Sequence, residues 1–127
     1  MIDLASQYGK GPIALKDIAK RQEISEKYLW HLISPLKHAG LINAVRGAFG
    51  GYVLAKSPKD INLKDIVSVV EGPICIVDCV DNASLCNRAS KCAARDIWSY
   101  TAKQIQNVLA GFTLDKMVAK QKNKIKH

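Results

Sequence analysis

The stretch "ISEKYLWHLISPLKHAGLINAVRGAFGGYVLAK" (residues 24–56) changes its hydrophobic period halfway along. In its first half, apolar residues recur every three or four positions, which indicates a helix that begins at Glu26 and ends near Gly40. Ser25 is well suited to cap the start of this helix, and Pro35 predicts a kink or a break within it. The second half contains two short runs rich in β-forming residues, "LINAV" and "YVLA", on either side of "RGAFGG". That pattern predicts a β-hairpin with a glycine-rich tip.

Two short helices are predicted before this stretch, over residues 2–8 and 14–22. Apolar side chains recur there at spacings of three and four, and "GKGP" separates the two segments. A helix–turn–helix followed by a two-stranded hairpin is the layout of a winged helix–turn–helix domain. We therefore expect a mainly α fold with a small β-hairpin wing, in which the helix after Ser25 is the recognition helix.

Two more helices are predicted after the hairpin. Asn62 is suited to cap the first of them, and a cysteine-bearing loop then leads to a long helix from Ala93 to about Gly111. The apolar stripe of the long helix is expected at Ile97, Thr101, Ile105, Val108 and Phe112. We expect this stripe to pair with a second copy of the chain, and the alternative is that it folds back on its own domain. The expected parts are a winged helix–turn–helix domain (1–72), a cysteine-rich sensing loop (73–92), and a dimerisation helix with a basic tail (93–127).

The composition favours a polyanionic partner. The 127 residues carry a formal net charge of +8 and a pI near 9.4, which favours nucleic acid over a membrane surface. Part of this positive charge comes from the lysine-rich end, whose side chains could instead be exposed to solvent without binding a partner. These are Lys116, Lys120, Lys122, Lys124 and Lys126. Without a membrane-spanning run or a signal peptide pattern, we expect a cytoplasmic protein with reduced thiols. We find no catalytic triad, phosphate-binding glycine loop or paired carboxylates that would indicate an enzyme.

The first two turns of the recognition helix carry the side chains expected to meet DNA. The exposed ones are Ser25, Glu26, Lys27, Trp30 and His31. Tyr28 is expected at the edge of the core, with its hydroxyl able to reach a phosphate. Arg46 lies beside Gly47 at the hairpin tip, where an arginine suits the minor groove. Serine and lysine suit phosphates, and lysine also suits guanine. Further candidate backbone contacts, each with the alternative of simple solvation, are Lys10, Lys16, Lys20 and Arg21.

Three cysteines lie close together in "CVDNASLCNRASKC" (residues 79–92), and Cys75 lies just upstream. Their spacing leaves three uses open: an iron–sulfur cluster, a zinc site completed by Cys75, and thiols that are reactive or merely structural. Zinc is the less favoured metal, because zinc sites usually pair cysteines two to four residues apart and only Cys75 and Cys79 fit that pattern.

Taken together, "ISEKYL", "VRGAFGGYVL" and three spaced cysteines before a long helix resemble the Rrf-two (Rrf2) family of winged-helix transcriptional regulators. The similarity runs from about Gly9 to Phe112. It implies a repressor that binds a pseudo-palindromic DNA duplex as a homodimer, with DNA contacts at Ser25, Lys27, Tyr28 and Arg46. It also implies an iron–sulfur cluster, 2Fe–2S or 4Fe–4S, held by Cys79, Cys86 and Cys92.

The family leaves an alternative open. Members that control iron–sulfur-cluster assembly or sense nitric oxide imply a cluster sensor. Members that control cysteine metabolism imply a cluster-free regulator, which responds through thiol oxidation or a protein partner. A small redox protein that is basic only to dock an acidic partner is the remaining alternative.

The chain departs from the family pattern in four places. One is Phe49, which stands in the wing where members carry a glycine or a small polar residue, and its ring is expected to pack against either the duplex sugar or its own domain. Trp30 stands where many members carry an acidic base-reading residue, and an indole cannot accept a hydrogen bond from cytosine, so the operator sequence does not transfer. Arg95 stands where some members carry a histidine as the fourth ligand. The candidates for that ligand are then Cys75, Asp78, Asp81, Asp96 or an exogenous group. Members also carry about a dozen more residues before position 1, which complete the first helix.

Overall fold

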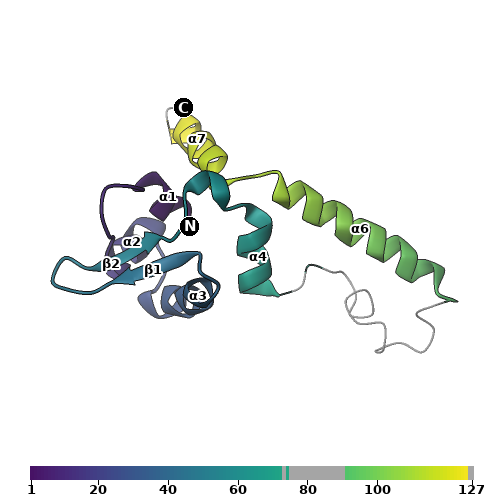
Figure 1. Ribbon diagram of the computed structural model, residues 1–127, viewed down its shortest axis with the longest axis horizontal. Helices are drawn as coiled ribbons and strands as arrows, with labels where there is room; N and C mark the ends of the chain where they lie inside the picture. Colours follow the sequence, from purple (N-terminus) through teal and green to yellow (C-terminus); the bar gives the residue numbers. More distant parts are fainter. Residues whose placement is uncertain (73, 75–90, 126–127) are drawn as a thin grey trace.

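The computed structural model describes residues 1–72, 74 and 91–125. The elements in chain order are α1 (Ile2–Ser6), α2 (Leu15–Gln22), α3 (Glu26–His38), β1 (Ile42–Val45), β2 (Gly51–Leu54), the 3-10 turn η1 (Pro58–Asp60), α4 (Leu63–Glu71), α6 (Ala93–Ala110) and α7 (Leu114–Ile125). Figure 1 shows α1, α2, α3 and the hairpin gathered into one body, from which α6 projects while α7 returns to it. The described part of the chain is therefore mainly helical with one small antiparallel hairpin, as predicted.

Local side-chain chemistry sets the starts of α3 and α4. The Ser25 Oγ accepts a hydrogen bond from the Tyr28 backbone N–H at 3.1 Å, which confirms the predicted cap of α3. The Asn62 side chain accepts from the Asp65 N–H at 2.9 Å, and Asp65 returns a bond to the Asn62 N–H, forming a capping box. Pro35 does not break α3, which continues through it to His38.

The hairpin pairs Ile42 with Leu54 at its base and Val45 with Gly51 near its tip. A β carbon on Gly50 would lie 2.2 Å from the Val45 carbonyl oxygen, and one on Gly51 would lie 2.2 Å from the Ile13 carbonyl oxygen. These close approaches of backbone to backbone explain why two glycines follow the tip. Tyr52 also exchanges two backbone hydrogen bonds with Ile13, at 2.9 and 3.0 Å, which fastens the wing to the segment before α2.

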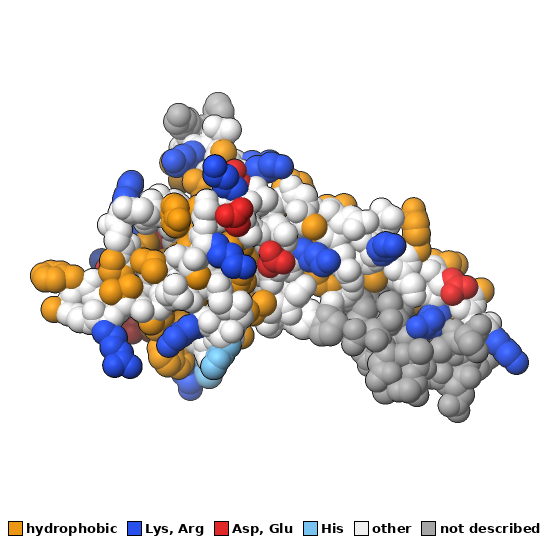
Figure 2. All heavy atoms as spheres, viewed as in Figure 1, with side chains coloured by type: hydrophobic (Ala, Val, Ile, Leu, Met, Phe, Trp, Pro, Cys, Tyr) orange, Lys and Arg blue, Asp and Glu red, His pale blue; other side chains and the backbone are white. Residues whose placement is uncertain are grey.

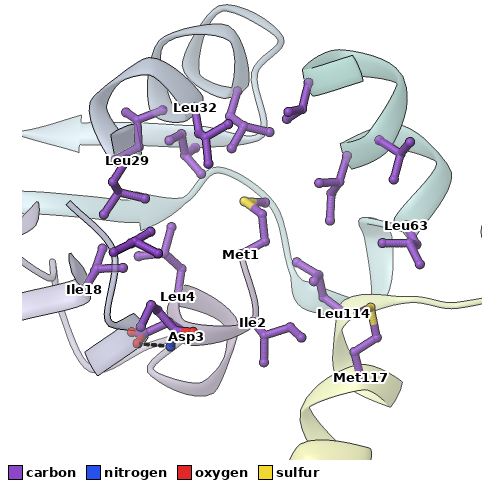
Figure 3. A pocket seen from close by; sticks show the side chains of 18 of the residues that line it. Met1, Ile2, Asp3, Leu4, Ile18, Leu29, Leu32, Leu63, Leu114 and Met117 are labelled. Carbon is purple, nitrogen blue, oxygen red and sulfur yellow. Dashed lines mark hydrogen bonds between the residues drawn. The ribbon is translucent and has the colours of Figure 1, made fainter. Parts of the chain in front are cut away.

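The core draws one or more side chains from almost every element, and its fully buried members are Ile42, Ile61 and Leu114. Beside this core, α1, α3, α4 and α7 surround an apolar cavity of about 550 Å³. Figure 3 shows side chains from these elements converging on it, among them Met1, Leu29, Leu63 and Met117. The inner face of α3 therefore lines this cavity. Its side chains make fewer packing contacts there than in a fully packed core.

The lysine-rich end is a packed helix over residues 114–125, a feature that our sequence analysis did not predict. Leu114 is 0% exposed, and α7 packs against α1 and η1. The Leu63 N–H donates to the Phe112 carbonyl at 2.8 Å, and the Leu114 N–H donates to the Ile61 carbonyl at 2.9 Å. The chain thus leaves the body after α4 and is tied back to the same place just before α7.

Candidate nucleic-acid interface and cysteine segment

One face of α3 is exposed along its whole length. Its side chains recur at spacings of three and four residues, opposite the buried Ile33 and Leu36: Lys27, Trp30, His31, Ser34, Lys37 and His38. Trp30 is 55% exposed, although a tryptophan normally loses most of its surface on folding. The face combines cationic, hydroxyl and aromatic groups, which are the groups that contact phosphates and base edges.

The predicted DNA contacts in the first turn of α3 are all exposed. The Ser25 Oγ accepts the capping hydrogen bond, so its hydroxyl proton remains available to a phosphate oxygen. Lys27 lies in the open, and the Tyr28 ring is more exposed than the sequence indicated, while also lying at the rim of the apolar cavity. These three residues therefore stand together at the N-terminal end of the helix.

The tip of the wing presents a second exposed group. Arg46 directly follows β1, and Gly47 adopts a φ of +120°, a conformation that L side chains rarely adopt. The Phe49 side chain is 94% exposed, so it does not pack against its own domain. Figure 2 shows a hydrophobic group at this outer end of the wing. An exposed cation and an exposed aromatic ring thus both lie at the tip.

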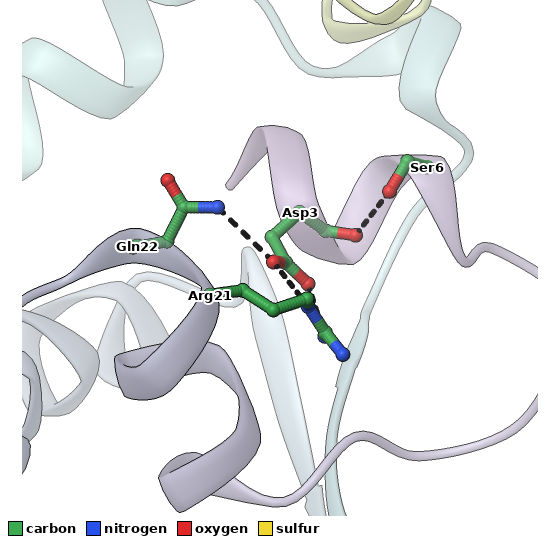
Figure 4. A network of polar contacts seen from close by, with 4 residues as sticks. All are labelled: Asp3, Ser6, Arg21 and Gln22. Atoms are coloured by element: carbon green, nitrogen blue, oxygen red, sulfur yellow. Dashed lines mark hydrogen bonds and ion pairs between the residues drawn. The ribbon is translucent and has the colours of Figure 1, made fainter.

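Arg21, predicted as a backbone contact, is engaged elsewhere. Its Nε and Nη2 donate to the Asp3 carboxylate at 2.9 and 2.6 Å, and the Gln22 amide donates to the same carboxylate at 3.1 Å (Figure 4). The hydrogen bonds from Arg21 hold the pKa of the Asp3 carboxyl below its ordinary value of 3.8, although burial of the carboxyl opposes this shift. The pair ties α1 to α2, and Lys10, Lys16 and Lys20 are left as the exposed cations of this region.

Asp3→Asn is expected to lower the free energy of unfolding by about 1 kcal/mol at pH 7, because the Asp3 side chain is only 8% exposed but that of Arg21 is 47% exposed and its charge is screened. The pKa of Asp3 is lower in the folded state than in the unfolded state. The ionised carboxylate therefore stabilises the fold at any pH above the ordinary pKa, and this stabilisation is lost as the pH falls through the folded-state pKa. Urea denaturation at pH 7 and at lower pH measures this, with Asp60→Asn on η1 as the exposed control. An equal difference between wild type and variant at all pH values would contradict the assignment.

Of the predicted metal ligands, only Cys92 lies within the described residues, whereas Cys79 and Cys86, like Cys75, lie outside them. Cys92 is the N-cap residue of α6, and its thiol is free and half-buried. Cys92 therefore lies directly before the 18-residue helix α6. No group of three metal-binding side chains occurs among the described residues.

Helix α6 has two apolar faces. The first packs against α4 and carries the buried Ala102, and beside it the Gln106 amide donates to the Ile74 carbonyl at 3.0 Å. The second carries the predicted stripe, in which Ile97 and Val108 are about 60% exposed and Ile105 and Phe112 about 40%. Figure 2 shows hydrophobic side chains along the projecting helix. The helix thus folds back on its own domain through one face and leaves the other uncovered.

Comparison with known proteins identifies the family. A model of the Rrf2 family, described as an iron-dependent transcriptional regulator, matches residues 1–120. The chain is 40% identical over 119 residues to the HTH-type transcriptional regulator CymR of Bacillus subtilis, covering 94% of this chain and 81% of CymR. It is 35% identical over 118 residues to the HTH-type transcriptional regulator IscR of Pectobacterium atrosepticum, covering 93% and 71%.

The fold agrees with these sequence matches. The solved structure of CymR (YrzC), the global cysteine regulator of B. subtilis, matches with a TM-score of 0.76 at 39% identity, covering 94% of this chain and 87% of that one. This confirms the winged helix–turn–helix fold with a long C-terminal helix, and the matched proteins are regulators rather than enzymes. Within residues 1–72, 74 and 91–125, no helix is both long and apolar enough to cross a membrane. The chain belongs to the Rrf2 family of DNA-binding, helix–turn–helix transcriptional regulators.

Proposed function

We propose that the chain is a homodimeric repressor whose affinity for a pseudo-palindromic operator is modulated by an iron–sulfur cluster. One observation carries the proposal: Cys92, the last of three spaced cysteines, is the N-cap of the helix whose second face is bare. In this proposal, residues 1–72 bind DNA, residues 73–92 hold the cluster that responds to the signal, and residues 93–127 form the dimer. The description of the matching family as iron-dependent supports this reading.

In this proposal, α3 enters the major groove with its first turns. Lys27, Trp30 and His31 face base edges, while Ser25 and Tyr28 contact phosphates at the groove edge. A second copy of the chain places an identical α3 in the next major groove, about 34 Å along the duplex. At the wing, Arg46 enters the adjacent minor groove, and the glycine at position 47 leaves the backbone narrow enough to follow it.

The donor set fits an iron–sulfur cluster, because Cys79, Cys86 and Cys92 supply three thiolates and the one described thiol lies at a helix N-terminus. Bound there, such a cluster supplies a group that responds to nitric oxide, oxygen or iron status. The chain's own part is to hold the start of α6 in one position relative to the body. The fourth ligand comes from Cys75, Asp78, Asp81, Asp96 or an exogenous group.

A packed route leads from the cysteine segment to the DNA-binding face. Helix α6 begins directly after its N-cap Cys92 and packs against α4, and α4 packs against α3. A change in the position of α6 therefore changes both the support of α3 and the separation of the two recognition helices in the dimer. Coupling of this kind between two sites amounts to about 1–3 kcal/mol, or roughly a 5- to 150-fold change in DNA affinity.

A cluster-free regulator is the second candidate. It is favoured by the 39% identity to a solved structure described as a global cysteine regulator, which makes thiol oxidation or a protein partner the signal. In that case Cys92, whose thiol is free and half-buried, is a candidate for the thiol that is oxidised.

Anaerobic purification followed by duplex binding tests the proposal. We expect iron and sulfide in the purified protein, DNA affinity that falls steeply with salt, and a 5- to 150-fold change in affinity after cluster removal. Protein without iron, whose DNA affinity is unchanged by reconstitution but changes on thiol oxidation, would replace the cluster with the second candidate. Binding to duplex DNA that does not depend on salt would contradict the DNA-contact assignments themselves.

A further inference from the structure

A pocket lies between α3 and the wing, and of the residues that line it only Trp30 has been assigned a DNA contact so far. Its volume is about 340 Å³, and it is lined by Trp30, Ile33, Ser34, Lys37, His38 and Tyr52. Ile33 belongs to the buried core, and the other five side chains each carry a hydrogen-bond donor. Among the described residues no carboxylate lines the pocket, so its chemistry is that of an anion site.

The position of the pocket along α3 identifies the anion. Lys37 lies ten residues after Lys27 on the same exposed face, a distance of about 15 Å along a helix that rises about 1.5 Å per residue. The major groove is only about 12 Å wide, so a helix that places Lys27 at base edges brings Lys37 beside the phosphate backbone. The wing bounds the same pocket through Tyr52.

We infer that this pocket holds one phosphodiester of the duplex, between the strand read by α3 and the wing. Lys37 and a ring N–H of His38 donate from the end of α3, and the hydroxyls of Ser34 and Tyr52 donate from its sides. The indole of Trp30 forms the wall nearest the bases. The bound phosphate thereby fixes the depth at which Trp30 enters the groove. The inference rests only on the DNA-binding part of the proposed function.

Lys37→Gln tests the pocket, because it removes one charge from an exposed position and leaves the helix intact. The affinity for a mixed-sequence duplex is expected to fall about tenfold, and the slope of log K against log salt to lose about 0.9. Lys59→Gln, an exposed lysine on η1, is the matched control and is expected to leave the slope unchanged. An unchanged slope in Lys37→Gln overturns the inference, whereas absence of salt-dependent duplex binding in the wild type overturns the proposed function.

Neutral methylphosphonate linkages, placed one at a time along the duplex, provide a second measurement. A neutral linkage at one position is expected to lower the DNA affinity of the wild-type protein about tenfold. The same linkage is expected to leave the affinity of Lys37→Gln unchanged, because both changes remove the same contact. Inorganic phosphate is titrated separately while Trp30 fluorescence is followed in a Trp98→Phe background. Saturation by millimolar inorganic phosphate, together with equal effects of every methylphosphonate on both proteins, would assign the pocket to a free anion and overturn the DNA assignment.

Discussion

Cys79→Ser, Cys86→Ser and Cys92→Ser are each expected to lower the iron content of anaerobically purified protein from stoichiometric to background. A serine hydroxyl stays protonated at neutral pH and cannot replace a thiolate ligand. Each variant is then expected to bind its operator as the cluster-free wild type does, with an affinity shifted 5- to 150-fold from that of the loaded protein. Iron and sulfide analysis together with fluorescence anisotropy measures both effects.

Cys75→Ser is the comparison variant, because it changes the same side chain four residues before Cys79. It is expected to keep its iron if the fourth ligand is an aspartate or an exogenous group, and to lose it if the fourth ligand is Cys75. Loss of metal in all four variants, with zinc instead of iron in the wild type, would indicate the closed four-thiolate site that zinc prefers. Iron that persists in Cys92→Ser would remove Cys92 from the ligand set, and with it the direct link between the cluster and α6.

Val108→Asp is expected to reduce the solution mass from twice the 14.0 kDa of the chain to the mass of one chain. Val108 lies in the last turn of α6 on its exposed apolar face, where a second copy would surround an unpaired carboxylate with apolar side chains. Operator affinity is expected to fall about 100-fold or more. A monomer binds one half-site only, whereas in a dimer the first bound subunit holds the second at a high effective concentration near its own half-site. Light scattering and duplex binding measure the two effects.

Asn107→Asp is the control, since it introduces the same carboxylate on the exposed polar side of α6 next to Val108. It is expected to remain dimeric and to bind DNA as the wild type does. If Val108→Asp also remains dimeric while its fold is intact, the bare face of α6 is not the dimer interface.

Local chemistry made much of the fold predictable from the sequence. Ser25 and Asn62 cap helices through hydrogen bonds to residues three positions later, so the relevant partners lie within one turn of chain. The hairpin follows from a change of hydrophobic period and from glycines that allow close backbone approach. The exposed face of α3 follows from helical spacing alone.

Long-range contacts were not predictable in this way. From the sequence, Arg21 is predicted to be a surface cation that could contact DNA. In the fold, Arg21 binds Asp3, which lies eighteen residues earlier in the chain. Helix α7 was not predicted from the sequence, because its many lysines indicated a solvated tail. Leu114, Met117 and Val118 nevertheless have the spacing of a buried helical stripe. The ligand set of the cysteines depends on how residues 79–92 converge in space, and spacing along the chain does not determine that.

The packing of α1 against α7 has a consequence for synthesis on the ribosome. Leu4 and Leu114 belong to one core, yet 110 positions separate them in the sequence. At 5–20 residues per second, the first helix waits on the order of ten seconds before its last partner is made. During this interval the DNA-reading half is already translated but its core is open. A nascent regulator therefore cannot adopt its finished fold before the final helix emerges.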